Sequence, residues 1–109
     1  MIKKLMILDG VMAVASFRDD GELVDGLGMQ DREQLAGLAR FAHDYKRIVQ
    51  GNADQLAMFT QVRGWTPPEG WIVCGPDVSV CSVGNVVCLV ESTVRLNEIM
   101  QELRAASQW

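Results

Sequence analysis

The stretch that decides the fold covers residues 74–91 and reads CGPDVSVCSVGNVVCLVE. Two valine-rich runs, residues 78–83 and 86–91, flank the pair Gly84-Asn85. Valine is enriched in β-strands, and a glycine-containing pair between two such runs is typical of a tight turn. We therefore expect an antiparallel hairpin in this part of the chain.

The register of this hairpin decides which side chains share a face of the sheet. A two-residue turn places Cys81 directly opposite Cys88. Because side chains alternate along a strand, one face carries Ser79, Cys81, Val83, Val86, Cys88 and Val90, and the other carries Val78, Val80, Ser82, Val87, Leu89 and Glu91. Both faces are mostly apolar, as in strands that are buried on both sides. The sheet is therefore predicted to carry helices on each face.

Other strand-like segments lie upstream of the hairpin. Residues 71–74 form a strand that the turn at residues 75–77 joins to the hairpin, which makes a three-stranded meander. Nearer the N-terminus, residues 11–17 and residues 22–25 flank an Asp-Gly pair, which is another strong hairpin signal. The residues that follow are expected to lead the chain out of the sheet: Gly26, Gly28 and Met29.

A long helix is predicted between the two groups of strands. Asp31 is its expected N-cap, and Gln34, three residues later, completes a capping-box-like pair. Its apolar stripe, at helical spacing, consists of Leu35, Leu38, Ala42, Tyr45 and Val49. The pattern resumes beyond Gly51, so the segment is either one kinked helix or two helices that share a C-cap.

Two further helices are expected near the chain ends. Residues 2–8 are compatible with a short helix. The last helix follows Ser92 or Thr93, and its apolar face consists of Leu96, Ile99, Met100, Leu103 and Ala106. The predicted order of elements is α-β-β-α-β-β-β-α.

Four roles compete for the three cysteines, Cys74, Cys81 and Cys88. Structural zinc sites usually take four ligands in close pairs, whereas these cysteines are widely spaced and the only histidine is the distant His43. A disulfide between Cys81 and Cys88 suits the register but is disfavoured in a reducing compartment. A nucleophile needs an electropositive, partly exposed setting, and neighbouring valines provide the opposite. We therefore expect the cysteines to fill the core, with no metal, cofactor or catalytic group.

The remaining polar candidates also favour structural roles. His43 lies beside Asp44 within helical spacing and is expected to be exposed rather than catalytic. The carboxylates of Asp19, Asp20 and Glu22 crowd the first hairpin turn, where contact with water explains them better than a metal site.

The loop before the meander is the best functional lead. Trp65 and Trp71 flank Pro67 and Pro68, which lack amide donors and stiffen the loop. Because tryptophan is enriched at interface hot spots, this loop is a candidate contact surface. The alternative is that both rings cover the sheet edge within one subunit, and the residues do not choose between the two.

Composition limits the classes of partner. The chain has 109 residues, which is typical of one domain, and a net charge of -4. Without a basic stripe, nucleic acid and anionic membrane surfaces are disfavoured as partners. Asp9 and Gly10 interrupt the first apolar run, so it is too short for a signal peptide, and no run approaches the ~20 residues of a membrane span. We therefore expect a cytoplasmic protein.

The order of elements and four stretches, LDGVMA, DDGELVD, GWTPPEGW and SVCSVGNVVCLVE, resemble the roadblock/LC7 family and a group of short bacterial proteins known only as a domain of unknown function. The resemblance covers residues 1–109 as a single domain. It implies an α/β (α+β) fold of roadblock/LC7, profilin-like architecture, with a five-stranded antiparallel sheet and helices on both faces. It also implies dimers, often with paired edge strands and adjacent long helices, and a link to small GTPases. No GTPase-contacting motif carries over residue by residue, and the first helix is shorter than in typical roadblock domains.

The leading functional hypothesis is a non-catalytic protein–protein interaction module. It would be a homodimer that acts as a scaffold or regulator, with a small GTPase as one candidate partner. Its interface would use the long helix and an edge strand, with Met58 and Phe59 as contacts that lie off the main apolar stripe.

Two alternatives remain open. One is a small-molecule sensor with a pocket near Trp65, Trp71 and Tyr45, because related folds hold ligands between sheet and helix. The other is a thiol or redox role for Cys81 and Cys88.

Overall fold

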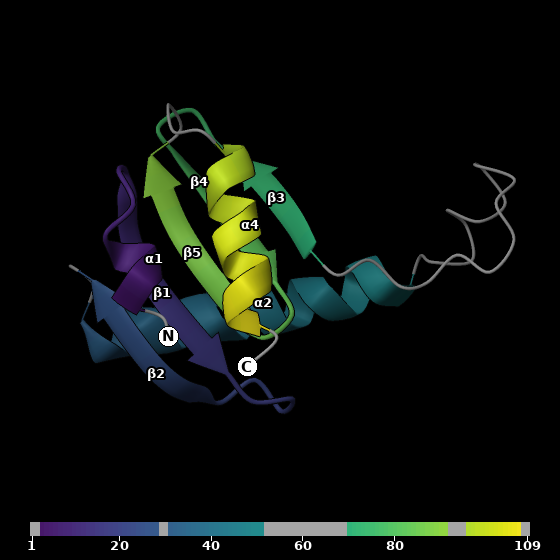
Figure 1. Ribbon diagram of the computed structural model, residues 1–109. Coiled ribbons are helices and arrows are strands. Elements are labelled where there is room, and N and C mark those ends of the chain that lie inside the picture. The colour runs from purple at the N-terminus through teal and green to yellow at the C-terminus, as the bar shows by residue number, and fades with distance from the viewer. Residues whose placement is uncertain (1–2, 29–30, 52–69, 92–95, 108–109) are drawn as a thin grey trace, which may run out of the picture.

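The computed structural model describes residues 3–28, 31–51, 70–91 and 96–107. Its helices and strands follow the predicted order (Figure 1). Along the chain they are α1 (Lys3–Met6), β1 (Val11–Phe17), β2 (Leu23–Gly28), α2 (Arg32–Gly51), β3 (Gly70–Cys74), β4 (Val78–Val83), β5 (Val86–Glu91) and α4 (Leu96–Ser107).

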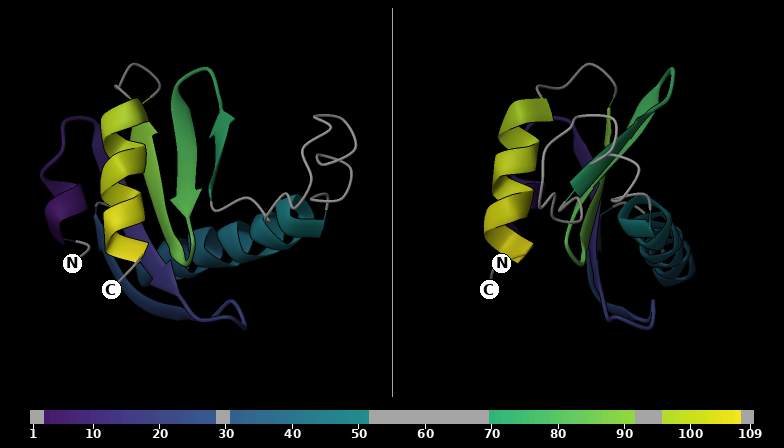
Figure 2. Two further views of the ribbon diagram at one scale, coloured as in Figure 1. Left: turned by 45° about the vertical axis from the view of Figure 1, so that its right-hand side comes forward. Right: turned by 90° about the vertical axis from the view of Figure 1, so that its right-hand side faces the viewer.

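The strands form one sheet in the order β2-β1-β5-β4-β3, and every neighbouring pair is antiparallel. Figure 2 shows α1 and α4 on one face of this sheet, while α2 crosses the opposite face. The predicted five-stranded antiparallel sheet with helices on both faces is confirmed. The outermost strands, β2 and β3, belong to different hairpins, so the two edges of the sheet differ in sequence.

The β4–β5 hairpin has the predicted register, with Val83 opposite Val86 and Cys81 opposite Cys88. Gly84 in the turn has a φ of 58°, a conformation that glycine adopts without the steric cost of a Cβ atom. The end of α4 packs against this turn, because a Cβ atom added at Gly84 would lie 3.0 Å from the Cβ of Ser107. One turn therefore positions both the strand pair and the last helix.

The two faces of the hairpin belong to separate hydrophobic clusters. The cluster under α1 and α4 contains Leu5, Val14, Cys81, Val83, Val86, Cys88, Val90, Ile99, Leu103 and Ala106. The cluster under α2 contains Ala15, Phe17, Ala39, Ala42, Trp71 and Val87. Val87 and Cys88 are consecutive in sequence and fully buried, yet they lie in opposite clusters. The burial on both faces that the alternation of side chains predicted is confirmed.

The prediction that Gly26 and Gly28 lead the chain out of the sheet is wrong, because both belong to β2. Each glycine is needed where another element comes close. A Cβ atom at Gly26 would lie 2.9 Å from Cδ1 of Leu35 in α2, and one at Gly28 would lie 2.5 Å from the carbonyl oxygen of Met12 in β1. These glycines therefore permit close packing inside the sheet, whereas the sequence alone suggested the end of the strand.

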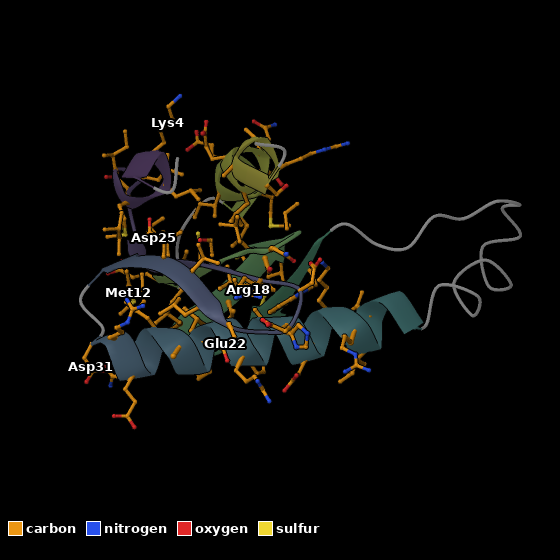
Figure 3. All side chains as sticks on the ribbon, turned by 90° about the horizontal axis from the view of Figure 1, so that it is seen from below. Lys4, Met12, Arg18, Glu22, Asp25 and Asp31 are labelled. Carbon is orange, nitrogen blue, oxygen red and sulfur yellow. The ribbon has the colours of Figure 1, made fainter. Side chains whose placement is uncertain are left out.

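The long helix α2 begins as predicted. The Oδ1 atom of Asp31 accepts a hydrogen bond from the Gln34 amide at 2.8 Å, and the Oε1 atom of Gln34 accepts one from the Asp31 amide at 3.1 Å. This pair is a capping box, which satisfies two amides at the helix N-terminus. In Figure 3, Asp31 lies at one end of α2 and the β1–β2 hairpin that carries Arg18 and Glu22 lies along the same helix. Whether the helix continues beyond Gly51, and whether Ser92 or Thr93 caps α4, lies outside the described residues.

Candidate interaction surface

Three aromatic rings meet where α2 passes over β3. The ring centroids of Tyr45 and Trp71 are 4.6 Å apart, and the ring of Phe41 lies 5.8 Å from each of them. Phe41 meets Trp71 nearly edge-on, with an interplanar angle of 79°, which is a favourable arrangement for two aromatic rings. The aromatic cluster therefore attaches one side of α2 to the outermost strand on that side of the sheet.

The outer part of this cluster is exposed. Phe41, Tyr45 and Ile48 follow one another at positions i, i+4 and i+7, so they lie on one side of α2. Phe41 is 43% exposed and Ile48 is 61% exposed, whereas Trp71 beneath them is only 9% exposed. We call Phe41, Tyr45, Ile48 and Trp71 the aromatic strip.

The aromatic strip lies next to an open sheet edge. β3 pairs with β4 on one side, and within the described part of the chain no strand pairs with its other side. An open edge presents backbone amides and carbonyls that another strand can pair with, so the apolar strip and the hydrogen-bonding edge form one continuous surface.

The sequence-predicted contact residues fall into two groups. The structure brings Tyr45 and Trp71 together and buries Trp71, so that this ring covers the sheet edge within the subunit. The direct contact between these two rings leaves no room for a ligand between them. The other predicted residues lie outside the described part of the chain: Met58, Phe59, Trp65, Pro67 and Pro68.

Sequence reasoning missed Phe41 and Ile48, the two most exposed members of the strip. Neither residue belongs to the apolar stripe of α2, and the contact residues predicted off that stripe are Met58 and Phe59 instead. The seven-residue interval between Phe41 and Ile48, two helical turns, was the available signal.

Two of the cysteines are buried as predicted. Cys81 and Cys88 are fully buried, and their thiols are not joined in a disulfide. Burial, and secondarily the nearby Cys74, raises the pKa of Cys81 to about 11, and burial followed by the effect of Cys81 raises the pKa of Cys88 to about 12. Thiols with such pKa values are protonated at neutral pH and are poor nucleophiles.

The prediction that all three cysteines fill the core is wrong for Cys74, which is exposed. Cys74 is the last residue of β3 and pairs with Ser79, so it lies on the same face as Cys81. Helix α4 packs mainly over β4 and β5, and its contact with β3 is made by Met100 near Gly70, at the opposite end of the strand from Cys74.

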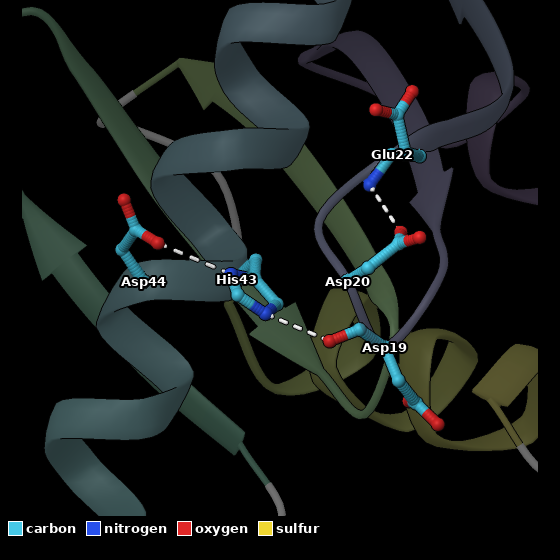
Figure 4. Close-up of polar contacts among 5 residues, drawn as sticks. All are labelled: Asp19, Asp20, Glu22, His43 and Asp44. Atoms are coloured by element: carbon cyan, nitrogen blue, oxygen red, sulfur yellow. Dashed lines mark hydrogen bonds and ion pairs between the residues drawn. The ribbon is translucent and has the colours of Figure 1, made fainter.

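The prediction that His43 is exposed is also wrong. Its side chain is only 14% exposed, because the β1–β2 hairpin folds back onto α2 and covers it. The Nε2 atom lies 2.8 Å from the carbonyl oxygen of Asp19, and Nδ1 lies 3.1 Å from Oδ1 of Asp44 (Figure 4). A carbonyl oxygen only accepts hydrogen bonds, so Nε2 is the donor and carries a proton. With both nitrogens engaged, His43 holds the hairpin against the helix.

A second polar connection runs beside the first. Nζ of Lys46 donates a hydrogen bond to Oδ1 of Asn85 at 2.8 Å, and Nδ2 of Asn85 donates one to Oδ1 of Asp19 at 2.9 Å. Helix α2, the β4–β5 turn and the β1–β2 turn are therefore linked through side chains at one end of the sheet.

The acidic turn itself is solvated. Asp20 accepts a hydrogen bond from the Glu22 amide at 2.9 Å and forms an ion pair with Arg18 at 3.5 Å, with both side chains of the ion pair more than half exposed. No group of three or more His, Cys, Asp or Glu residues within the described ranges is arranged to hold a metal ion. Among the helices that the structure describes, none has the length and apolar character required to cross a membrane.

Comparison with known proteins identifies the fold. The roadblock/LC7 domain from Streptomyces avermitilis superimposes with a TM-score of 0.82 at 9% identity, over 99% of this chain and 88% of that chain. The gliding protein MglB from Thermus thermophilus gives a TM-score of 0.78 at 13% identity, over 98% of this chain and 80% of that chain. MglB from Myxococcus xanthus gives 0.70 at 15% identity, over 98% and 82%. At these identities the likeness establishes the fold alone, and it is the roadblock/LC7 fold that the sequence resemblance implied.

Sequence comparison gives a family. None of the curated proteins matches the chain. A family model described as "Uncharacterized conserved protein (DUF2173)" matches residues 1–105, which is nearly the whole chain. The chain therefore belongs to this family of uncharacterized conserved proteins, and its fold is that of a roadblock/LC7 domain.

Proposed function

We propose that this protein is a non-catalytic interaction module that forms a homodimer and regulates a partner protein, with a small GTPase as the candidate partner. The single observation that carries the proposal is the aromatic strip beside the outer edge of β3, with which no strand of the described residues pairs. Exposed apolar side chains that adjoin an unpaired strand edge mark a protein-binding surface or an aggregation hazard. Pairing with a second copy would bury both features at once.

Two further observations support this reading. One of the solved structures with this fold is described as MglB with a tetrameric arrangement, so self-association occurs on the same scaffold. The side chains best suited to catalysis are also engaged in the structure. The thiols of Cys81 and Cys88 are buried, and both ring nitrogens of His43 contact other groups, which supports a non-catalytic role. The same thiol burial disfavours the redox alternative.

The dimer is tested by sedimentation velocity of the full chain over a range of micromolar concentrations. The wild-type protein should sediment as a dimer. Ile48→Glu places a carboxylate in the aromatic strip, and we expect it to raise the dissociation constant at least about thirtyfold, as for an interface hot spot.

Ala36→Glu is the matched control. It introduces the same charge at an exposed position of α2, on the side away from the strip, and should leave the dimer intact. A wild-type chain that remains monomeric throughout the concentration range, or equal effects of the two variants, would refute the proposed interface.

The regulatory part is tested with purified small GTPases from the same host. The expected result is a change in the rate of GTP hydrolysis or nucleotide exchange when the wild-type chain is added. If the dimer forms but none of these GTPases responds, the interaction module stands and the GTPase partner is wrong.

A further inference from the structure

The strand at the other edge of the sheet, β2, differs from β3 in how it presents its backbone. β2 pairs with β1, and no strand of the described residues pairs with its outer side. An unpaired edge is a template on which another chain can add a strand. Pairing of the β3 edge of one copy with the β2 edge of the next would be a heterologous contact, and such contacts repeat into rings or fibres instead of closing as a dimer.

A β-bulge interrupts β2. Ser16 of β1 lies opposite Asp25 of β2. The next residue of β1, Phe17, lies opposite Leu23, so Val24 is an extra residue without a partner in β1. A bulge bends its strand and increases the local twist, which makes this edge a poor match for an incoming strand. By contrast, β3 pairs with β4 along its whole length without a shift of register.

The backbone of Gly26 faces the outer side of β2. The amide of Phe17 donates to the carbonyl oxygen of Asn85 at 3.0 Å, so it points towards β5 and away from β2. Because successive residues of a strand direct their backbone groups to opposite sides, those of Ala15 also point towards β5. Ala15 lies opposite Gly26, and in such a non-hydrogen-bonded pair the backbone groups of Gly26 point away from β1. The Gly26 amide is therefore directed to the side from which another strand would approach.

The carboxylate of Asp25 engages this outward amide. Its Oδ1 atom accepts a hydrogen bond from the Gly26 amide at 2.9 Å. An acceptor that carries a negative charge therefore stands where an incoming strand would place its carbonyl oxygen. The edge of β3 has no such group, because the sequence of this strand, GWIVC, contains no charged residue.

We infer that the Val24 bulge and the Asp25 carboxylate protect the β2 edge from other chains and confine strand pairing between copies to the β3 edge. Bulges and charged side chains are devices by which natural sheets keep exposed edges from aggregating. The protection of β2 is a property of the single chain. Only its consequence, an assembly that stops at the dimer, rests on the proposed function.

Asp25→Val is the main test, because it removes the acceptor and the charge and introduces a residue that favours strands. In sedimentation velocity of the full chain, most of this variant should sediment as species larger than the wild-type protein. Asp25→Asn keeps an oxygen that can accept from the Gly26 amide and loses only the charge, so its association should lie between those of the wild-type protein and Asp25→Val. Circular dichroism of each variant shows whether the associating chain is folded.

Glu22→Val is the matched control. It makes the same change of charge and side chain in the same hairpin, at a position where the backbone is already engaged. The Glu22 amide donates to Oδ1 of Asp20 at 2.9 Å, and its carbonyl oxygen accepts from the Arg18 amide at 2.9 Å. This variant should sediment like the wild-type protein.

A double variant, Asp25→Val with Ile48→Glu, separates this inference from the proposed dimer. Ile48→Glu alone should weaken the dimer, whereas the double variant should still associate through β2. A monomeric wild-type chain would refute the proposed dimer and leave the protection of β2 in place, provided that Asp25→Val still associates. The inference is overturned if folded Asp25→Val sediments like the wild-type protein or if Glu22→Val associates equally. It is also overturned if Asp25→Val associates only after losing its fold while Asp25→Asn sediments like the wild-type protein.

Discussion

The carbonyl oxygen of Asp19 and the Nε2 atom of His43 are 2.8 Å apart, and this hydrogen bond attaches the β1–β2 turn to the middle of α2. Asp19 is also held from a third element, because Asn85 in the β4–β5 turn donates to its carboxylate at 2.9 Å. Arg18, Asp19 and Asp20 in this turn are exposed, so hydrogen bonds hold this part of the turn in place more than apolar burial does. The His43 side chain is only 14% exposed, so His43 is a suitable place to test the connection.

His43→Ala should destabilise the protein by about 1–3 kcal/mol. It removes the hydrogen bond to Asp19 and the edge-on contact with the ring of Phe17, and it leaves a cavity beneath Gly21. Urea unfolding followed by circular dichroism measures the change.

Asp44→Ala is the control for His43→Ala, because it removes the other hydrogen-bonding partner of the ring. The Asp44 side chain is 61% exposed, so we expect a loss of less than about 1 kcal/mol. If both variants lose the same stability, the contact with Asp44 rather than the bond to the hairpin holds His43.

Two glycine substitutions should change stability in opposite directions. Gly28→Ala forces a Cβ atom within 2.5 Å of the Met12 carbonyl at a φ of 134°, and should cost at least about 2 kcal/mol. Gly37→Ala lies in α2, where a Cβ atom meets nothing within 4 Å, and should stabilise the protein by about 0.5–1 kcal/mol. Thermal unfolding of both variants measures these changes in stability. If Gly28→Ala stabilised the protein, the close approach of β1 and β2 at this position would be absent.

The sequence was sufficient for the fold wherever local pattern and tertiary structure agree. In the β4–β5 hairpin, the two-residue turn at Gly84-Asn85 determines the pairing, and the alternation of side chains then assigns Val87 and Cys88 to opposite faces. The capping box at Asp31 is equally local. These features depend only on residues a few positions apart, so no knowledge of the packing was required.

Prediction failed where a distant element decides the environment. Gly26 in β2 is explained by Leu35 of α2, and the burial of His43 by a hairpin that precedes it in the chain. Cys74 shares the seven-residue spacing of the buried cysteines, but it is exposed at the end of β3 that lies away from the contact between Gly70 and Met100 of α4. The candidate surface was missed in the same way, because the exposure of Phe41 and Ile48 depends on which side of α2 the sheet occupies.

The three cysteines should differ sharply in reactivity. At pH 8 the native protein should react with iodoacetamide at Cys74 alone, because the thiols of Cys81 and Cys88 are buried and their pKa values are raised to about 11 and 12. Intact-mass spectrometry should show one modification per chain, rising to three in denaturant. Cys74→Ala should abolish the native reaction, and rapid modification of Cys88 in the native state would contradict the buried geometry.

The same pKa shifts make the folded state sensitive to alkaline pH. The thiols of Cys81 and Cys88 have an ordinary pKa of 9.0, and burial raises both values in the folded state. Below pH 9 these thiols are protonated in both states, so their contribution to stability is fully present. As the pH rises from 9 towards 11, the unfolded chain loses these protons while the folded chain keeps them, and the free energy of unfolding falls. The slope should approach roughly 1.4 kcal/mol per pH unit for each thiol.

Urea unfolding at pH 7, 9 and 10 measures this slope, and variants separate it from the titration of other groups. A double variant, Cys81→Ala with Cys88→Ala, should be less stable at pH 7 because it leaves small cavities, but its stability should fall less steeply above pH 9. Cys74→Ala should keep the wild-type slope, because this residue is exposed in the native state. Parallel curves for the wild-type protein and the double variant would mean that the native sheet does not shield the two thiols from deprotonation.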